Sequence, residues 1–144
     1  MQQPVYKHTF PIQLRWNDAD QFGHINNTIY LQYYDTAKIE YFRSLGLLMD
    51  AHHAIVAVHI EADFIAQVYT NSHVAVQTSV VHIGHKSFTL AQQLIDADTH
   101  EIKCKAETIM VAYNLEEGQS VALWPDWKDK ILKFENHVDL STKH

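Results

Sequence analysis

The stretch that decides the fold is RWNDADQFGHINNTIYLQYYDTAKIEYF, residues 15–42. Its first part is rich in Asn, Asp and Gly and follows neither a helical nor a strand period, which is typical of an ordered polar loop. Over residues 28–45 apolar side chains instead recur every three or four positions. Polar residues 26–28 can cap the start of this helix, and Gly46 is placed to end it. The sequence therefore predicts one helix ~27 Å long directly after a polar loop.

The apolar stripe of this helix is unusually wide and aromatic. It consists of Tyr30, Tyr33, Tyr34, Ala37, Tyr41 and Leu45, widened by Ile39 and Phe42. A stripe of this width needs more than one flat surface to cover it. We therefore expect the helix to be wrapped by the layer against which it packs.

The rest of the chain has the composition and alternation of β-strands. We expect strands over residues 8–16, 53–66, 72–84, 87–98 and 101–114, and a short amphipathic helix that begins at Pro125. This order predicts an α+β fold with a five-stranded antiparallel sheet and one long helix, forming a single domain over residues 1–144. A sheet that wraps one helix leaves a face or an edge uncovered, so we also expect dimerisation.

Composition excludes several classes of function. The chain has 144 residues, with 11 Lys and Arg against 17 Asp and Glu, a formal net charge of −6. This charge disfavours binding to nucleic acid and to anionic membrane surfaces. The N-terminus has no apolar segment typical of a secretion signal, and no stretch approaches the ~18 apolar residues of a membrane span. We expect a cytoplasmic protein.

Neither cysteine nor histidine predicts a metal site. Cys104 is the only cysteine, which excludes an internal disulfide and a cysteine-rich zinc site. The chain has 11 histidines, but the pairs His52-His53 and His82-x-x-His85 lack convincing zinc geometry. We expect no metal and no cofactor.

The polar loop carries the densest set of reactive side chains. Asp18 and Asp20 alternate, so on an extended segment they would point to the same side. The loop ends where the helix begins, and a helix N-terminus offers unpaired N–H groups and the positive end of the helix dipole. Such a site can hold an oxyanion beside a carboxylate that acts as nucleophile or base. The same residue types also make an ordinary turn and helix cap.

The segment resembles the start of the hotdog-fold acyl-CoA thioesterases of the 4-hydroxybenzoyl-CoA thioesterase type. The residues that carry the resemblance are Asp18-Ala19-Asp20, Gly23, His24-Ile25-Asn26-Asn27, Tyr30 and Tyr33-Tyr34-Asp35. The later segment Ile83-Gly84-His85-Lys86-Ser87-Phe88 is similar to a strand-turn-strand corner of that family. The resemblance implies the hotdog fold, in which the antiparallel sheet wraps one long central helix.

The resemblance also implies roles for individual residues. Asp20 matches the catalytic carboxylate, which attacks the thioester carbonyl or activates a water molecule that does. Asn27 falls where the family uses a backbone N–H to stabilise the oxyanion. His24 either orients water or only hydrogen-bonds within the loop, and Asp18 is expected to brace the loop.

Further residues are implied in substrate binding. Lys86 and Ser87 match residues near the nucleotide phosphates of coenzyme A, which is part of the substrate rather than a cofactor. A solvated turn lysine is the alternative interpretation of Lys86. Tyr30 is a core residue that can also line the acyl pocket. The resemblance implies a homodimer or homotetramer, with the site and a pantetheine tunnel at a subunit interface.

Three other functions stay open on the sequence. The segment Arg-Trp-Asn-Asp, followed by His-Ile-Asn-Asn, also resembles plant-type acyl-carrier-protein thioesterases, a branch of the same superfamily. A non-catalytic acyl-CoA binding module would keep the fold without turnover. A hotdog hydratase needs an Asp and a His at a characteristic spacing, which Asp20 and His24 match poorly.

Overall fold

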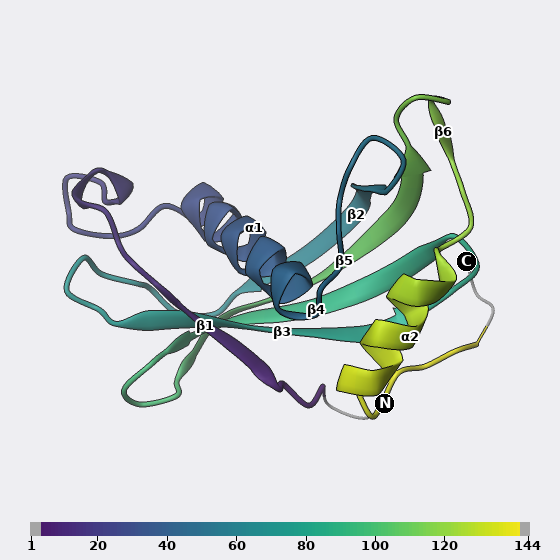
Figure 1. Cartoon of the computed structure of the whole chain (residues 1–144). Coiled ribbons are helices and arrows are strands. Elements are labelled where there is room, and N and C mark those ends of the chain that lie inside the picture. The colour runs from purple at the N-terminus through teal and green to yellow at the C-terminus, as the bar shows by residue number, and fades with distance from the viewer. Residues whose placement is uncertain (1–3, 142–144) are drawn as a thin grey trace.

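The computed structural model of the chain describes residues 4–141 and contains a single antiparallel sheet with two helices (Figure 1). The elements in chain order are β1 (His8–Ile12), a 3-10 turn η1 (Trp16–Asp18), α1 (Asn27–Ser44), β2 (Ala54–Phe64), β3 (Val74–Ile83), β4 (Ser87–Asp96), β5 (Ile102–Asn114), β6 (Gln119–Ser120) and α2 (Pro125–Phe134). The sheet order is β1-β3-β4-β5-β2, and β6 pairs with β5. The predicted α+β architecture is confirmed.

Helix α1 begins and ends where its capping residues predict. The Asn26 side chain accepts a hydrogen bond from the Thr28 N–H, and the chain leaves the helix just before Gly46, whose φ of 75° lies in the left-handed region. Most of the predicted stripe is buried, namely Tyr30, Tyr33, Tyr34, Ala37, Tyr41 and Phe42. Figure 1 shows α1 lying across one face of the sheet, with the η1 loop beyond its N-terminal end.

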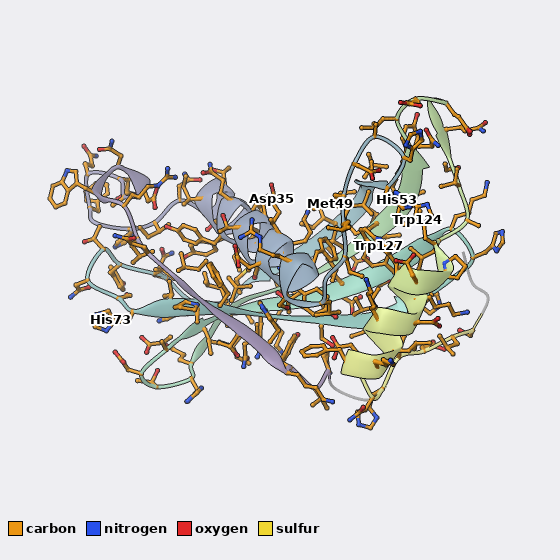
Figure 2. The ribbon with its side chains drawn as sticks, in the orientation of Figure 1. Asp35, Met49, His53, His73, Trp124 and Trp127 are labelled. Atoms are coloured by element: carbon orange, nitrogen blue, oxygen red, sulfur yellow. The ribbon has the colours of Figure 1, made fainter. Side chains whose placement is uncertain are left out.

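Two clusters of buried side chains divide the core along α1. The C-terminal half of the helix packs Tyr41 and Phe42 against the sheet and against Trp127 and Ile131 of α2. Trp124 lies beside Trp127 with 4.9 Å between ring centroids (Figure 2). The N-terminal half packs in a second cluster that consists of Ile25, Tyr30, Tyr33, Tyr34, Ala37, Val68, Val74, Val76, Leu94, Cys104 and Ala106. Cys104 is thus a small core residue, as its position in the strand pattern predicts.

The structure adds one strand to the five that the sequence predicts. Gln119 and Ser120 pair with Asn114 and Tyr113 of β5. The chain reverses there because Gly118 adopts a φ of 67°. A two-residue strand is too short to leave a periodic pattern in the sequence.

Strand β2 forms one edge of the sheet and is largely exposed. It has 11 residues, of which all but Val58, at a bulge, pair with β5, and no other strand of residues 4–141 pairs with its outer side. Val56, Val58, Ile60 and Phe64 along it are exposed apolar residues. A long apolar edge strand of this kind normally needs a cover.

No helix among residues 4–141 is long and apolar enough to span a membrane.

Candidate functional site

The loop between β1 and α1 closes on itself around Asp20. Ala19 and Ile25 form an antiparallel bridge, and the Asp20 N–H donates to the carbonyl oxygen of His24 at 2.8 Å. Gly23 makes this turn possible because its φ of 77° lies in the left-handed region. The result is a small hairpin that ends two residues before α1.

Inside this hairpin one carboxylate oxygen of Asp20 is fixed and the other is not engaged. Asp20 Oδ1 accepts hydrogen bonds from the backbone N–H groups of Phe22 (2.9 Å) and His24 (3.1 Å). No donor within residues 4–141 reaches Oδ2, and the residue is exposed. Asp20 is therefore held in place through Oδ1, while Oδ2 has no donor among these residues. A nucleophile or general base requires such a positioned carboxylate with one oxygen left to react.

Asp18 has a different environment from the one that simple alternation predicts. The sequence places it on the same side as Asp20 of an extended segment, but the η1 turn directs it into the core, where it is 4% exposed. Its Oδ2 accepts from the Tyr33 hydroxyl (2.8 Å) and the Arg15 N–H (3.0 Å), and Oδ1 lies 3.2 Å from the Arg15 guanidinium. Asp18 thus braces the loop against α1.

The pKa of Asp18 reflects these contacts. Burial alone would raise the pKa of this carboxyl. Hydrogen bonds from Arg15 and Tyr33, together with the Arg15 charge, outweigh the burial and hold the pKa below its ordinary value. Asp18 is consequently ionised at neutral pH and keeps both of its anchors.

The loop over residues 68–70 packs against the hairpin and supports it. The Ile25 N–H donates to the Val68 carbonyl (2.9 Å), and the Thr70 N–H donates to the Gly23 carbonyl (3.2 Å). The Tyr69 ring packs edge-on against the His24 ring, with 4.9 Å between centroids. Tyr69 is therefore a site residue that the sequence analysis missed, because this contact joins segments more than 40 residues apart and leaves no local signal.

His24 and Tyr30 contact the loops rather than an open cleft. His24 holds Asp20 through its backbone N–H, and its imidazole packs on Tyr69. Tyr30 is 1% exposed, and its hydroxyl accepts a hydrogen bond from the Val68 N–H at 3.1 Å. In a single chain both side chains therefore stabilise the two loops around Asp20.

The first N–H of α1 is left open beside this hairpin. The Asn26 side chain takes the Thr28 N–H, and the Asn26 carbonyl takes the Ile29 N–H. In the part of the chain that the structure describes, nothing accepts a hydrogen bond from the Asn27 N–H. This donor lies at the positive end of the helix dipole, so it is suited to bind developing negative charge.

Lys86 and Ser87 lie at the opposite end of the sheet. Ile12 at the end of β1 pairs with Val74, whereas Lys86 follows the other end of β3, about 30 Å away at the usual rise of a strand. Lys86 is exposed, and the Ser87 hydroxyl is buried without a partner among the described residues. Within one chain the structure brings together Asp20, His24, Asn27 and Tyr30, and keeps Lys86 and Ser87 apart from them.

Among residues 4–141 there is no cluster of three or more His, Cys, Asp or Glu side chains suited to hold a metal ion. The exposed His52 and the half-buried His53 pair with separate carboxylates instead, Glu116 at 2.8 Å and Asp50 at 3.0 Å.

Comparisons with known proteins match most of the chain. A family model of the thioesterase-like superfamily matches residues 14–132, which include the Asp20 hairpin and α1. YsmA of Bacillus subtilis (strain 168) is 26% identical over 125 residues, which are 84% of this chain and 82% of YsmA.

Solved structures show the same fold. The PA5185 protein of Pseudomonas aeruginosa strain PAO1 superposes with a TM-score of 0.83 at 24% identity, covering 93% of this chain and 95% of that chain. A thioesterase from Thermus thermophilus, complexed with coenzyme A and Zn, superposes with a TM-score of 0.79 at 23% identity, covering 90% of this chain and 95% of that chain. The chain thus shares its overall fold with these proteins.

Proposed function

The chain belongs to the thioesterase-like superfamily and has its hotdog fold, and on this basis we propose that it hydrolyses the thioester bond of an acyl-CoA. The observation that carries the proposal is the pairing of a held, half-free carboxylate, Asp20, with the open Asn27 N–H. The coenzyme A bound in the Thermus thermophilus structure favours CoA as the carrier of the acyl group.

The proposed reaction needs few groups. The thioester carbonyl oxygen would bind at the Asn27 N–H, where the helix dipole stabilises the negative charge of the tetrahedral intermediate. Asp20 Oδ2 either attacks the carbonyl carbon, giving a mixed anhydride that water hydrolyses, or takes a proton from the attacking water. In both routes the C–S bond breaks and coenzyme A leaves as a thiolate, which is a good leaving group because thiol pKa values are low.

The proposal is tested by following thiol release from a panel of acyl-CoAs with wild type, Asp20→Asn and Asp20→Ala. Removing a reacting carboxylate should lower kcat by at least about 100-fold. Asp20→Asn should leave the free energy of unfolding nearly unchanged, because its amide oxygen can still accept from the Phe22 and His24 N–H groups, whereas Asp20→Ala loses both hydrogen bonds. Near wild-type rates in either variant would contradict the role of Asp20. Tight acyl-CoA binding without turnover by the wild type would instead indicate a binding module.

We also propose that β2 pairs antiparallel with β2 of a second copy. The long apolar edge of β2 supports this pairing. Ile55 lies opposite Ala112 and Phe64 opposite Cys104, so β2 runs from the Lys86 end of the sheet to the Asp20 end. A two-fold axis at the middle of β2 would therefore set Asp20 beside Lys86 of the partner subunit, which gives Lys86 its predicted access to the substrate.

Pairing through β2 predicts that a charge on this edge breaks the dimer. Val58, which is 59% exposed at the bulge of β2, is the residue to change. Val58→Lys should shift the mass in solution, measured by light scattering, from a dimer or tetramer toward smaller species. Val5→Lys is the matched control, since Val5 is 51% exposed outside β2. An unchanged mass for Val58→Lys would contradict pairing through this edge.

A further inference from the structure

A pocket of about 320 Å³ opens between α1 and strands β2, β4 and β5. The residues that line it are Leu31, Gln32, Tyr34, Asp35, Lys38, Ala57, Ile60, Gln92 and Thr108. Its walls are mostly apolar, and the Lys38 ammonium forms an ion pair at 2.8 Å with Asp35, which is labelled on α1 in Figure 2. Its volume is at the lower end for small-molecule sites, so it suits a small or narrow ligand.

The floor of this pocket carries two polar side chains that are more than nine-tenths buried. Gln92 is 3% exposed and Thr108 is 6% exposed. Gln92 uses both amide hydrogens, which donate to the Tyr34 carbonyl (2.9 Å) and the Thr78 hydroxyl (3.1 Å). These acceptors fix the amide orientation, and no donor from residues 4–141 reaches the Gln92 carbonyl oxygen.

Thr108 lies beside Gln92 in the pocket and also has a polar atom without a partner among the described residues. It lies opposite Ile60 of β2 and is the diagonal neighbour of Gln92 across β4 and β5. No hydrogen bond joins its hydroxyl to any residue in 4–141. Neither this hydroxyl nor the Gln92 carbonyl oxygen is among the buried polar atoms of residues 4–141 without a partner, so both remain accessible from the pocket that their residues line. A ligand that fills the pocket displaces water from these two atoms and must bring both an acceptor and a donor.

The pocket lies along α1 from the proposed oxyanion site. Gln92 is hydrogen-bonded beneath the carbonyl of Tyr34, seven residues after Asn27. At 1.5 Å per residue this separation is about 10 Å along the helix, which an extended acyl chain of about eight carbons spans. The apolar walls Leu31, Ala57 and Ile60 would cover the methylene groups on the way.

We propose that this pocket holds the far end of the acyl group and selects acyl chains with a hydroxyl about eight carbons from the thioester. This inference rests on the proposed thioesterase activity. The hydroxyl donates to the Gln92 carbonyl and accepts from the Thr108 hydroxyl, so that both buried groups are satisfied. An unsubstituted chain of the same length leaves them dry and unpaired, which a site built for a hydroxyl penalises.

The test compares 8-hydroxyoctanoyl-CoA with octanoyl-CoA. Wild type should favour the hydroxylated substrate by at least about tenfold in kcat/KM. Thr108→Val keeps the shape of the side chain without the hydroxyl and should bring the ratio close to one. Thr108→Ser restores the hydroxyl and should restore most of the preference. Thr89→Val is the matched control, since Thr89 pairs with Ile109 on the opposite face of the sheet and should leave the ratio unchanged.

The outcomes separate a failure of the hydroxyl selection from a failure of the proposed thioesterase activity. A ratio near one in wild type, or a Thr108→Val ratio equal to that of wild type, overturns the selection by the pocket floor. A Thr108→Ser ratio as low as that of Thr108→Val overturns the role of the hydroxyl. Measuring unfolding of each variant corrects the rates for the folded fraction. If wild type hydrolyses neither substrate nor any acyl-CoA of the panel, the proposed function fails and the inference falls with it.

Discussion

The two ends of α1 differ in how deeply their polar groups are buried. At the C-terminal end Glu135 is 5% exposed, and its Oε2 accepts from both the Tyr41 hydroxyl (2.7 Å) and the Val80 N–H (3.0 Å). At the N-terminal end Asp20 and Asn27 are exposed, Asp20 Oδ2 has no donor, and the Asn27 N–H has no acceptor among residues 4–141. The buried contacts at the C-terminal end stabilise the fold, whereas the polar groups at the N-terminal end lie at the surface.

The surroundings of Tyr41 at the C-terminal end and of Asp20 at the N-terminal end differ accordingly. Burial and the Glu135 charge raise the pKa of Tyr41, so its hydroxyl stays protonated and keeps donating at ordinary pH. Around it, Phe42 packs on Phe88 and on Trp127 with 6.0 and 5.8 Å between ring centroids. Asp20, by contrast, is exposed in a loop that is held by backbone hydrogen bonds. Substitutions at the two ends should therefore affect different properties.

The largest effect should come from removing the Asn27 N–H, the donor without an acceptor among residues 4–141 at the N-terminal end. Proline is tolerated at the first helical position, and Asn26 already has the extended conformation, φ −68° and ψ 145°, that proline requires before it. Asn27→Pro should therefore lower kcat by about 100- to 1,000-fold, the usual effect of losing an oxyanion donor. Asn27→Ala keeps the N–H and should retain most of the activity. Equal rates for the two variants would exclude the Asn27 N–H as the oxyanion donor.

The corresponding change at the C-terminal end should affect stability instead. Glu135→Ala removes the one carboxylate oxygen, Oε2, that accepts from both the Tyr41 hydroxyl and the Val80 N–H, so both donors lose their acceptor. We expect a loss of at least about 2 kcal/mol in the free energy of unfolding, measured by urea denaturation, with activity per folded molecule preserved. The same change at an exposed residue, Glu117→Ala, should change stability by less than ~0.5 kcal/mol. A loss of activity without a loss of stability in Glu135→Ala would remove the distinction between the two ends.

Asp18 lies in the loop before α1 but is buried and paired. Its substitution should have the smallest effect of the three, on stability. Its pKa is lower in the folded chain than the ordinary value of 3.8, so its ionisation stabilises the fold above that value. This contribution is lost as pH falls through the folded-state pKa. Asp18→Asn should therefore destabilise the chain by about 1–2 kcal/mol at pH 7, and the difference from wild type should shrink below about pH 4. A difference that is constant from pH 7 to pH 3 would exclude this ionisation as its cause.

The sequence predicts the elements of the fold because their patterns are local. The stripe that runs from Tyr30 to Phe42 locates α1, and the predicted start at residue 28 differs from the observed Asn27 by one position. Strand β6 escapes such patterns because two residues carry no period.

The site is predictable only in part, because its contacts are not local. The chemistry of the loop and the resemblance together indicate Asp20 and the start of α1. The different environments of Asp18 and Asp20 depend on the η1 turn, and the position of Tyr69 depends on pairing between residues 23–25 and 68–70. Lys86 matches the family by motif, yet the strand order places it at the far end of the sheet.

A crystal structure with a non-hydrolysable acyl-CoA analogue, in which a methylene replaces the sulfur, tests the central claim most directly. The ketone oxygen should lie about 2.7–3.1 Å from the Asn27 nitrogen, and the ketone carbon should face Asp20 Oδ2 at about 3–3.5 Å or through one water. A ketone bound away from the N-terminal end of α1, with Asp20 and the Asn27 N–H both open to solvent, would contradict this claim.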